Sequence, residues 1–229
     1  DVGGYSLNYH KHIHTGEGGI LVTNNNKIAR NLRLLRNHAE AVVSEKTNKK
    51  NLINMIGNNF RLGEMEASIG IEQLKKLNTI IKSRLKISKY LINKLKKIKF
   101  IKLPKNYKNI KNVFYVIPIL LDIKKIKFSR KKILKELNKF GAKGLTEGYV
   151  NLHTQPLFKN KICYGSKGFP WSFFKNKISY KKGICPVAEN FHEKSLLLYQ
   201  GVSLYDLTKT NVDDLVLAFK KTWKKLGIN

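Results

Sequence analysis

Cysteine is scarce in this 229-residue chain, which has it only at Cys163 and Cys185. Two cysteines are too few for a disulfide framework, and their spacing fits no metal-ligand pattern, so we expect no metal. Such a pair is typical of a protein in a reducing cytoplasm, where we expect both thiols to be buried. Long apolar runs are also absent, since no stretch reaches the roughly 18 residues of a membrane-spanning helix. These absences predict a cytoplasmic protein with no membrane partner.

Acidic residues are few as well, 15 against 45 lysines and arginines, which gives a formal net charge of +30. Such an excess of positive charge suggests nucleic acid as a partner. Most of the excess is lysine spread between Lys75 and Lys143, however, without an arginine-rich tract, zinc-finger spacing or aromatic RNA-binding strand. We interpret these lysines as solvated helix faces and expect no specific nucleic-acid partner. A basic nucleic-acid-binding protein stays open as an alternative that rests on charge alone.

The chain does have a lysine set among histidines near its first residues. Lys11 stands among His10, His12 and His14 and precedes a Gly-Glu-Gly-Gly turn at residues 16–19. A lysine amine forms covalent bonds only when neutral, and its ordinary pKa of about 10.4 keeps it charged at neutral pH. Burial or nearby positive charge lowers such a pKa and yields a nucleophile able to form a Schiff base. On composition alone, a surface lysine before a hairpin turn is the simpler interpretation.

The segment around Lys11 has the pattern Ser6-x-x-x-x-Lys11, then Thr15-Gly-Glu-Gly-Gly19 and Val22-Thr-Asn24. This pattern resembles the cofactor-lysine segment of the nucleotide-sugar aminotransferases, the DegT/StrS family. Members of that family use pyridoxal 5′-phosphate (PLP) and have a fold of the aspartate-aminotransferase type. The resemblance implies that Lys11 holds PLP as a Schiff base and that Ser6 binds the cofactor phosphate.

A second stretch, residues 57–70, resembles the family's G-x-N-(Y/F)-R-(M/L) motif and the helix after it. In the family the asparagine of this motif, here Asn59, reaches across a dimer interface to the phosphate of the partner's PLP, which implies a homodimer. Amides donate to phosphate oxygens without adding charge, although Gly-Asn-Asn is also favourable turn chemistry. Arg61 is suited to bidentate contacts with a carboxylate or phosphate, so it is a candidate substrate-binding residue.

Family members carry a long segment before the position of Asp1. That segment holds the residue that stacks on the PLP ring, the aspartate that pairs with the pyridine nitrogen and part of the phosphate site. The resemblance therefore implies that this chain is the C-terminal portion of an α/β enzyme. Residues 1–80 would be the C-terminal part of the large PLP-binding domain, and residues 81–229 would form the small C-terminal α/β domain.

Hydrophobic periodicity and cap residues predict the local structure of the first part of the chain. The expected elements are a strand, a turn and a strand over 6–23, a helix over 27–40, a loop over 41–56, and one bent helix or two helices over 62–97. Asn25 or Asn26 is the expected N-cap of the first helix.

Strands and helices alternate in the remainder. The expected strands are 100–103, 113–121 and 143–146. Pro118 makes the middle one an edge or bulged strand. Ser129 caps a helix that ends at Gly141, Pro186 begins another, and residues 210–213 approximate a capping box for the last. This βαβ-like alternation is typical of a small α/β domain.

Residues 149–158 resemble the family's aromatic, histidine-containing segment that ends in Gln-Pro and borders the active site. His153 is thus a candidate substrate contact, with a hydrogen-bonded structural histidine as the alternative. An aromatic loop over 164–180 either folds over the sugar or nucleotide base or packs internally. Pro186-Val-Ala-Glu189 resembles the family's Pro-x-Ala-Glu, but the usual Leu-Pro after it is absent and Leu198–Val202 stands there instead.

The resemblance implies a PLP-dependent aminotransferase that converts a nucleotide-linked keto-sugar to an amino-sugar, with glutamate as amino donor, for cell-surface polysaccharide or glycan synthesis. Lys11 would also move the proton as general acid and base. Family members with histidine in place of this lysine act as dehydratases, so Lys11 favours transamination. The second hypothesis is a catalytically incomplete fragment or subunit that needs a separate N-terminal half.

Overall fold

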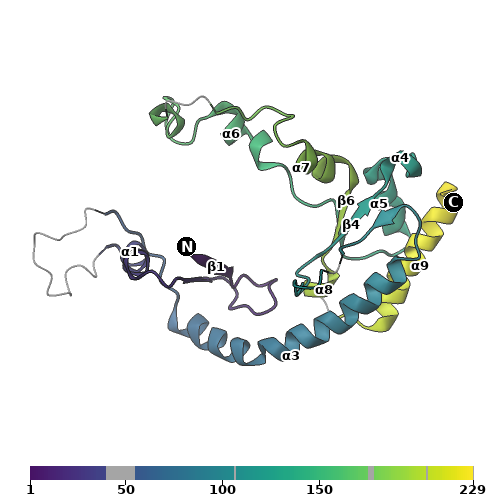
Figure 1. Cartoon of the computed structure of the whole chain (residues 1–229), viewed down its shortest axis with the longest axis horizontal. Coiled ribbons are helices and arrows are strands. Elements are labelled where there is room, and N and C mark those ends of the chain that lie inside the picture. The colour runs from purple at the N-terminus through teal and green to yellow at the C-terminus, as the bar shows by residue number, and fades with distance from the viewer. Residues whose placement is uncertain (40–54, 106, 175–177, 205, 229) are drawn as a thin grey trace, which may run out of the picture. The chain divides into compact units, whose positions relative to one another are not determined.

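The computed structural model describes residues 1–39, 55–105, 107–174, 178–204 and 206–228 (Figure 1). The chain divides into two compact units, residues 1–82 and 83–229. The boundary at residue 80 concerns the domains of a complete enzyme and stays a prediction. The loop expected over 41–56 lies almost wholly outside the described residues.

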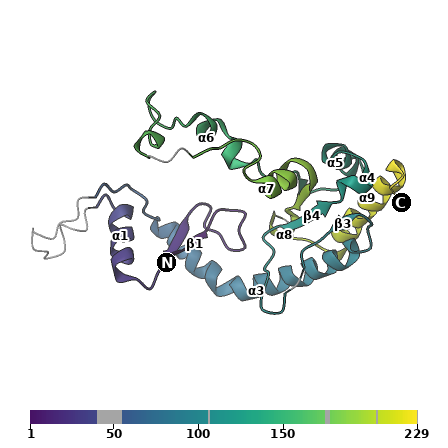
Figure 2. The same cartoon turned by 45° about the horizontal axis from the view of Figure 1, so that its top comes forward.

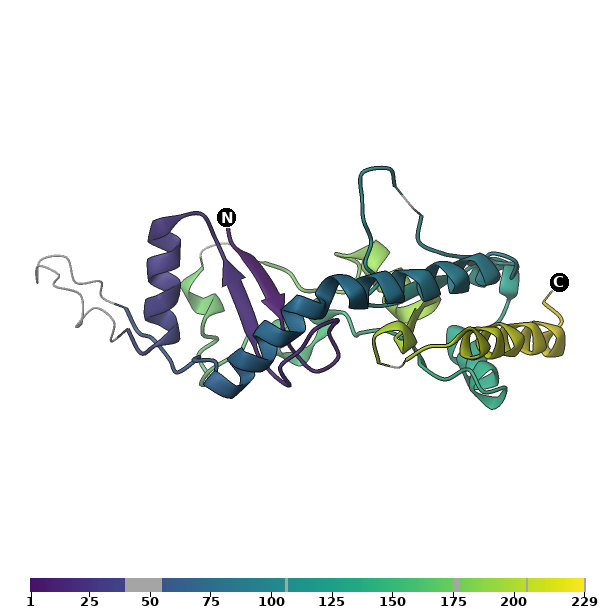
Figure 3. The same cartoon turned by 90° about the horizontal axis from the view of Figure 1, so that it is seen from below.

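A two-stranded antiparallel sheet begins the first unit. β1 (Gly3–Ser6) pairs with β2 (Gly19–Val22), with Ser6 opposite Gly19 and Gly3 opposite Val22, seen as two opposed arrows in Figure 3. The turn between them contains Gly16 at φ 87°, a conformation that glycine adopts without a steric penalty. The predicted order of strand, turn and strand is confirmed, with the first strand ending at Ser6 instead of beginning there.

The next element is α1 (Asn26–Arg36). Asn25 is its N-cap, because the Asn25 side chain accepts a hydrogen bond of 3.1 Å from the N–H of Ile28, as the sequence predicts. The helix ends at Arg36, and the predicted end at residue 40 is wrong. His38 and Ala39 have positive φ values of 52° and 62°, which an α-helix cannot contain.

α3 (Glu64–Leu95) is one helix of 32 residues, where the sequence left one or two open. Its C-terminal turns bury Leu91 and Leu95 completely in the second unit. Its N-terminal turns, in the first unit, leave Met65 and Leu74 exposed. The apolar stripe predicted for this helix is therefore buried only over its C-terminal part.

The second unit is built on a four-stranded sheet in the order β3-β4-β6-β5. The strands are β3 (Ile101–Lys102), β4 (Ile117–Leu121), β5 (Leu145–Thr146) and β6 (Leu196–Tyr199). All neighbours are antiparallel. Because β4 and β5 both run opposite to β6, they run in the same direction with β6 between them. The expected βαβ alternation is thus a split βαβ unit, in which β6 lies between the two parallel strands.

β4 is an internal strand that pairs with β6 in a continuous register, so the prediction that Pro118 makes it an edge or bulged strand is wrong. Pro118 lies opposite Leu198 of β6. On the other side, β3 pairs only with Leu120 and Leu121 of β4. Pro118 therefore has a strand neighbour on one side alone, which is the local environment in which a strand tolerates a proline.

Three helices pack on one face of this sheet. They are α4 (Ile123–Ile126), α5 (Arg130–Lys139) and α9 (Lys209–Leu226), which lie together beside β4 in Figure 2. The core below them joins the C-terminal part of α3 to the sheet. Its fully buried members include Leu91, Leu95, Ile117, Ile119, Ile133, Leu137, Leu197, Val212 and Phe219. The register of the sheet explains which strand residues join this core, since Ile119 lies opposite Leu197 and both side chains point to the same face.

Of two helix caps predicted from the sequence, one is confirmed and one is misplaced. Ser129 caps α5 as predicted, accepting a hydrogen bond of 3.2 Å from the N–H of Lys132. The last helix instead begins at Lys209, with Thr208 and Asn211 forming a capping box. The box predicted at residues 210–213 is therefore wrong by position, and Thr210 lies inside the first turn. The short helix α8 (Gly201–Leu204) comes between β6 and α9.

A long excursion leaves β5 and returns at β6. It contains the 3₁₀ turn η2 (Leu152–Thr154), α6 (Pro156–Asn160), the 3₁₀ turn η3 (Trp171–Phe173), α7 (Pro186–Asn190) and the π-helical turn η4 (Phe191–Ser195). Its aromatic loop packs partly on itself, since Trp171 Nε1 donates to the Tyr180 hydroxyl at 3.0 Å. Phe173, by contrast, is 78% exposed.

Both cysteines lie in this excursion, and both are free and exposed. The prediction of buried thiols is therefore wrong, because Cys163 and Cys185 belong to irregular segments outside the sheet core. Across the described ranges, no helix combines the length and the apolar character that crossing a membrane requires.

Candidate functional site

Lys11 lies in the turn that connects β1 to β2. Three backbone hydrogen bonds close this turn: Leu7 N–H donates to Gly18 O at 2.9 Å, Thr15 N–H to Leu7 O at 3.0 Å, and Lys11 N–H to Asn8 O at 2.9 Å. Side chains add to them, because Thr15 Oγ1 donates to the carbonyl of Glu17 at 2.7 Å. Leu7 and Thr15 are 4% and 6% exposed, so the base of the loop is buried.

Ser6 is the last residue of β1, at the point where the chain enters the Lys11 loop. Its hydroxyl oxygen accepts a hydrogen bond of 3.2 Å from the N–H of Asn8. Since a hydroxyl also has a hydrogen to donate, Ser6 can still bind an external acceptor such as a phosphate oxygen. The structure thus brings two predicted site residues, Ser6 and Lys11, into one hydrogen-bonded loop.

The loop packs against the segment that leads into α3. A β-carbon at Gly18 would lie 3.0 Å from Leu62 Cδ1, and one at Gly70 would lie 3.2 Å from Thr15 Cγ2. Gly18 also has φ 147°, which side chains rarely adopt. These close approaches explain why the sequence has glycine at both positions.

Asn59 and Arg61 join the end of α1 in the same unit. Asn59 forms an isolated β-bridge with Asn37, and Arg61 Nη1 donates to Asn37 Oδ1 at 2.5 Å. Asn59 Oδ1 accepts from the N–H of Arg61 at 3.3 Å, which is the turn role that the sequence left open. The Asn59 side chain still offers Nδ2 as a donor, and the residue is exposed.

Gly57 makes this arrangement possible. A β-carbon there would lie 2.7 Å from His38 C and 2.8 Å from Leu34 O, and would also collide with Ala39 N. All three are backbone atoms that cannot move aside without shifting the end of α1. The glycine that opens the predicted Asn59 motif therefore has a packing reason.

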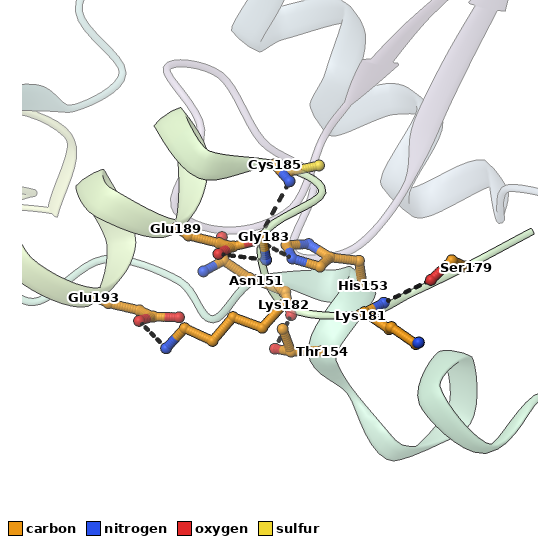
Figure 4. Close-up of polar contacts among 10 residues, drawn as sticks. All are labelled: Asn151, His153, Thr154, Ser179, Lys181, Lys182, Gly183, Cys185, Glu189 and Glu193. Atoms are coloured by element: carbon orange, nitrogen blue, oxygen red, sulfur yellow. Dashed lines mark hydrogen bonds and ion pairs between the residues drawn. The ribbon is translucent and has the colours of Figure 1, made fainter.

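The second unit contains His153, in η2. His153 Nε2 lies 2.9 Å from Glu189 Oε1, and the two side chains are 12% and 9% exposed (Figure 4). Glu189 also accepts two backbone N–H groups, from Gly183 at 2.8 Å and from Cys185 at 3.3 Å. His153 is thus the hydrogen-bonded histidine of the sequence alternative, and its substrate role stays a prediction.

The Glu189 carboxyl has a pKa below its ordinary value. Burial is the largest effect and by itself would raise that pKa. The hydrogen bonds from Gly183 N–H, His153 and Cys185 N–H together outweigh burial, because they all favour the ionised form. Glu189 is therefore a carboxylate at neutral pH. Sequence reasoning noticed Glu189 only as part of Pro-x-Ala-Glu and assigned it no contact.

An apolar groove of about 1020 Å³ lies between the β1–β2 sheet and α1 in the first unit. Its lining includes Leu21, Leu32, Leu35, Phe60 and Leu62 but none of Ser6, Lys11 or Asn59. The groove therefore does not include the predicted cofactor residues, although Tyr5 and Phe60, which line it, are their neighbours in the chain.

Residues 1–217 match the DegT/DnrJ/EryC1/StrS aminotransferase family. The chain belongs to this family. An uncharacterized protein of Methanocaldococcus jannaschii is 29% identical over 228 residues, which cover 96% of this chain and 53% of that protein. The UDP-4-amino-4,6-dideoxy-N-acetyl-beta-L-altrosamine transaminase of Helicobacter pylori is 27% identical over 167 residues, which cover 70% of this chain and 42% of that protein.

The fold also matches solved structures. The structure of E. coli GDP-4-keto-6-deoxy-D-mannose-3-dehydratase with bound hydrated PLP matches with a TM-score of 0.69 at 23% identity, covering 95% of this chain and 54% of that one. The chain thus spans about half the length of the relatives that it matches. The family, the α/β fold and the partial coverage expected from the sequence are confirmed.

Proposed function

We propose that this chain forms the lysine-bearing part of a PLP-dependent aminotransferase that converts a nucleotide-linked keto-sugar to an amino-sugar in the cytoplasm. Glutamate is the proposed amino donor. The observation that carries the proposal is the loop that joins Ser6 and Lys11 in a chain of the aminotransferase family. The named activity of the Helicobacter pylori relative, a UDP-sugar transaminase, supports a nucleotide-sugar substrate.

The donor set of the loop fits PLP. Ser6 has a hydroxyl hydrogen to donate to a phosphate oxygen, since its oxygen already accepts from Asn8. Lys11 supplies the amine that binds the cofactor covalently. Asn59 of a second copy of this chain would donate Nδ2 to the same phosphate, so the proposed active unit is a homodimer. Arg61 and His153 are the proposed substrate contacts.

When bound, PLP supplies an electron sink that stabilises negative charge on the carbon that loses its proton. Lys11 Nζ, freed from the cofactor when the donor amine displaces it, would move that proton from Cα of the amino-acid donor to the C4′ carbon of the cofactor. In the second half of the reaction it would move a proton from C4′ to the sugar carbon that receives the amino group, so one amine would act as base and as acid. The closed loop contributes by holding the backbone of Lys11 in a fixed place relative to Ser6.

The test is to replace Lys11 in the complete enzyme. Lys11→Ala and Lys11→Arg should each abolish transamination of a nucleotide-linked keto-sugar and the visible absorbance of PLP held by a protein lysine as a Schiff base. Lys75→Ala is the matched control, because Lys75 is an exposed lysine that pairs with Glu72, and it should keep both. Retention of both signals in the Lys11 variants would overturn the proposal.

A second candidate is a chain that is inactive until a separate N-terminal half joins it. The apolar surface of the first unit favours it, since Ile20, Leu21 and Val22 are 44%, 58% and 48% exposed. Among the described residues, the β1–β2 sheet has no third strand, and an isolated two-stranded sheet is at best marginally stable. Aggregation of the chain expressed alone, reversed by a co-expressed N-terminal half, would support this candidate. A monodisperse chain that binds PLP tightly by itself would exclude it.

A further inference from the structure

Glu189 connects the two ends of the long excursion between β5 and β6 in the second unit. His153 lies at the outgoing end, in η2, and Gly183 and Cys185 lie at the returning end, just before α7. The Glu189 carboxylate binds all three: His153 Nε2 at 2.9 Å, Gly183 N at 2.8 Å and Cys185 N at 3.3 Å (Figure 4). Its position is thus fixed by two backbone donors independently of the histidine.

These contacts determine which tautomer a neutral His153 ring adopts. A carboxylate has only acceptors, so the nitrogen facing it, Nε2, must carry the hydrogen. A neutral imidazole has one N–H, and Nδ1 is then unprotonated. Carboxylates that orient a functional histidine in this way fix both its tautomer and its ring plane.

We infer that Glu189 is a positioning residue for substrate binding: it holds His153 in the Nε2–H tautomer, so that Nδ1 accepts a hydrogen bond from a hydroxyl of the substrate. Sugars present hydroxyl donors, which an unprotonated ring nitrogen can accept. The substrate half of this inference rests on the proposed function. The tautomer half rests only on the contacts of Glu189.

A purely structural role for Glu189 is the alternative, because the same carboxylate holds the turn before α7. Glu193 offers a matched control on the next turn of the chain. Its carboxylate binds Lys182 Nζ at 2.6 Å and is 32% exposed (Figure 4). It therefore makes an ion pair with the same returning segment without touching the histidine. Removing Glu193 tests loss of a local contact alone.

The deciding measurement is the ¹⁵N spectrum of the histidine rings in the complete enzyme at neutral pH, with the His153 signals assigned by their loss in His153→Asn. The expected wild-type spectrum has Nε2 protonated and Nδ1 unprotonated. Glu193→Gln should leave it unchanged, and Glu189→Ala should shift His153 toward a mixture of the two tautomers. A wild-type His153 with Nδ1 protonated would overturn the inference even if Glu189→Ala does not fold. A folded Glu189→Ala variant with the wild-type spectrum would also overturn the inference.

Kinetics of the complete enzyme test the substrate half. Losing one hydrogen bond should raise KM for the nucleotide-sugar about threefold to tenfold in Glu189→Ala, with kcat nearly unchanged. His153→Ala should have the same effect, and the double variant should be no worse than His153→Ala, because Glu189 acts through the histidine. If the KM increases of the two single variants multiply in the double variant, Glu189 does not act through His153 and the inference is wrong. An enzyme without transamination would refute the proposed function, and the ring spectrum would still decide the role of Glu189.

Discussion

Glu136 of α5 and Lys225 of α9 form an ion pair of 2.7 Å that ties the two helices together. The Glu136 side chain is only 2% exposed, and its carboxylate also lies 3.2 Å from Lys139 Nζ and 3.6 Å from Lys132 Nζ. A buried carboxylate surrounded by three lysines shows that part of the excess positive charge is structural. The three lysine side chains are still 49–52% exposed, so they remain part of solvated helix faces as the sequence predicts.

Glu136→Gln should destabilise the second unit at neutral pH and lose that effect in acid. Hydrogen bonds from Lys225 and Lys139 lower the pKa of Glu136 to about 2, against an opposing effect of burial. Because the folded pKa is depressed, the stabilisation is fully present above the ordinary glutamate pKa of about 4.3 and is lost as pH falls toward 2. Urea unfolding from pH 2 to pH 7 checks this.

Glu72→Gln is the control for Glu136, since Glu72 forms an exposed pair with Lys75. Such pairs contribute about 0–1 kcal/mol, so this variant should unfold almost like the wild type at every pH. Equal effects of Glu136→Gln and Glu72→Gln at pH 7 would refute the structural role of the Glu136 cluster.

Glu189 should titrate below the ordinary glutamate range. Its pKa is lowered because hydrogen bonds from Gly183, His153 and Cys185 outweigh the opposing effect of burial. Its contribution to stability is thus present above about pH 4.3 and is lost as pH falls through the lower, folded-state pKa. The amide proton of Gly183, which donates to both carboxylate oxygens, reports this titration by NMR. A midpoint at or above the ordinary value would contradict the described contacts.

Gly57→Ala should cost about 1–3 kcal/mol of unfolding free energy, because the added β-carbon meets backbone atoms of Leu34, His38 and Ala39. Gly4→Ala is the control: its β-carbon has only an ordinary contact of 3.4 Å, to Leu21 Cδ2. That variant should be close to neutral in the same thermal unfolding experiment. Equal stability of the two variants would show that the end of α1 does not approach Gly57 as described.

Thr208→Ala should destabilise α9 by about 1 kcal/mol, since Thr208 Oγ1 accepts from the N–H of Asn211 at 3.2 Å. Thr210→Ala should have little effect, because Thr210 lies inside the helix and is exposed. Denaturant unfolding of both variants distinguishes the observed cap from the one that the sequence suggested. The reverse order of effects would place the helix start at Thr210.

The elements that sequence predicted well are those specified by local chemistry. Asn25 and Ser129 cap helices through their own side chains, and the glycines after Lys11 produce the turn between β1 and β2. Both family motifs could be found because they are contiguous. For the same reason the family and the fold were accessible without the structure.

The elements that sequence missed depend on distant partners. β6 is a run of only four apolar residues, Leu196–Tyr199, with no period that separates a strand from a short buried helix. Pro118 indicated an edge strand because only the structure shows how short β3 is. The His153–Glu189 bond joins residues 36 positions apart, and no spacing rule predicts it.

The most direct test of the central claim is borohydride reduction of the native enzyme without added PLP, followed by peptide mapping. Reduction fixes the cofactor to the lysine that holds it as a Schiff base. The account predicts a pyridoxyl group on Lys11 and its loss in Lys11→Arg. An active enzyme with the group on another lysine, or with none, would contradict the account.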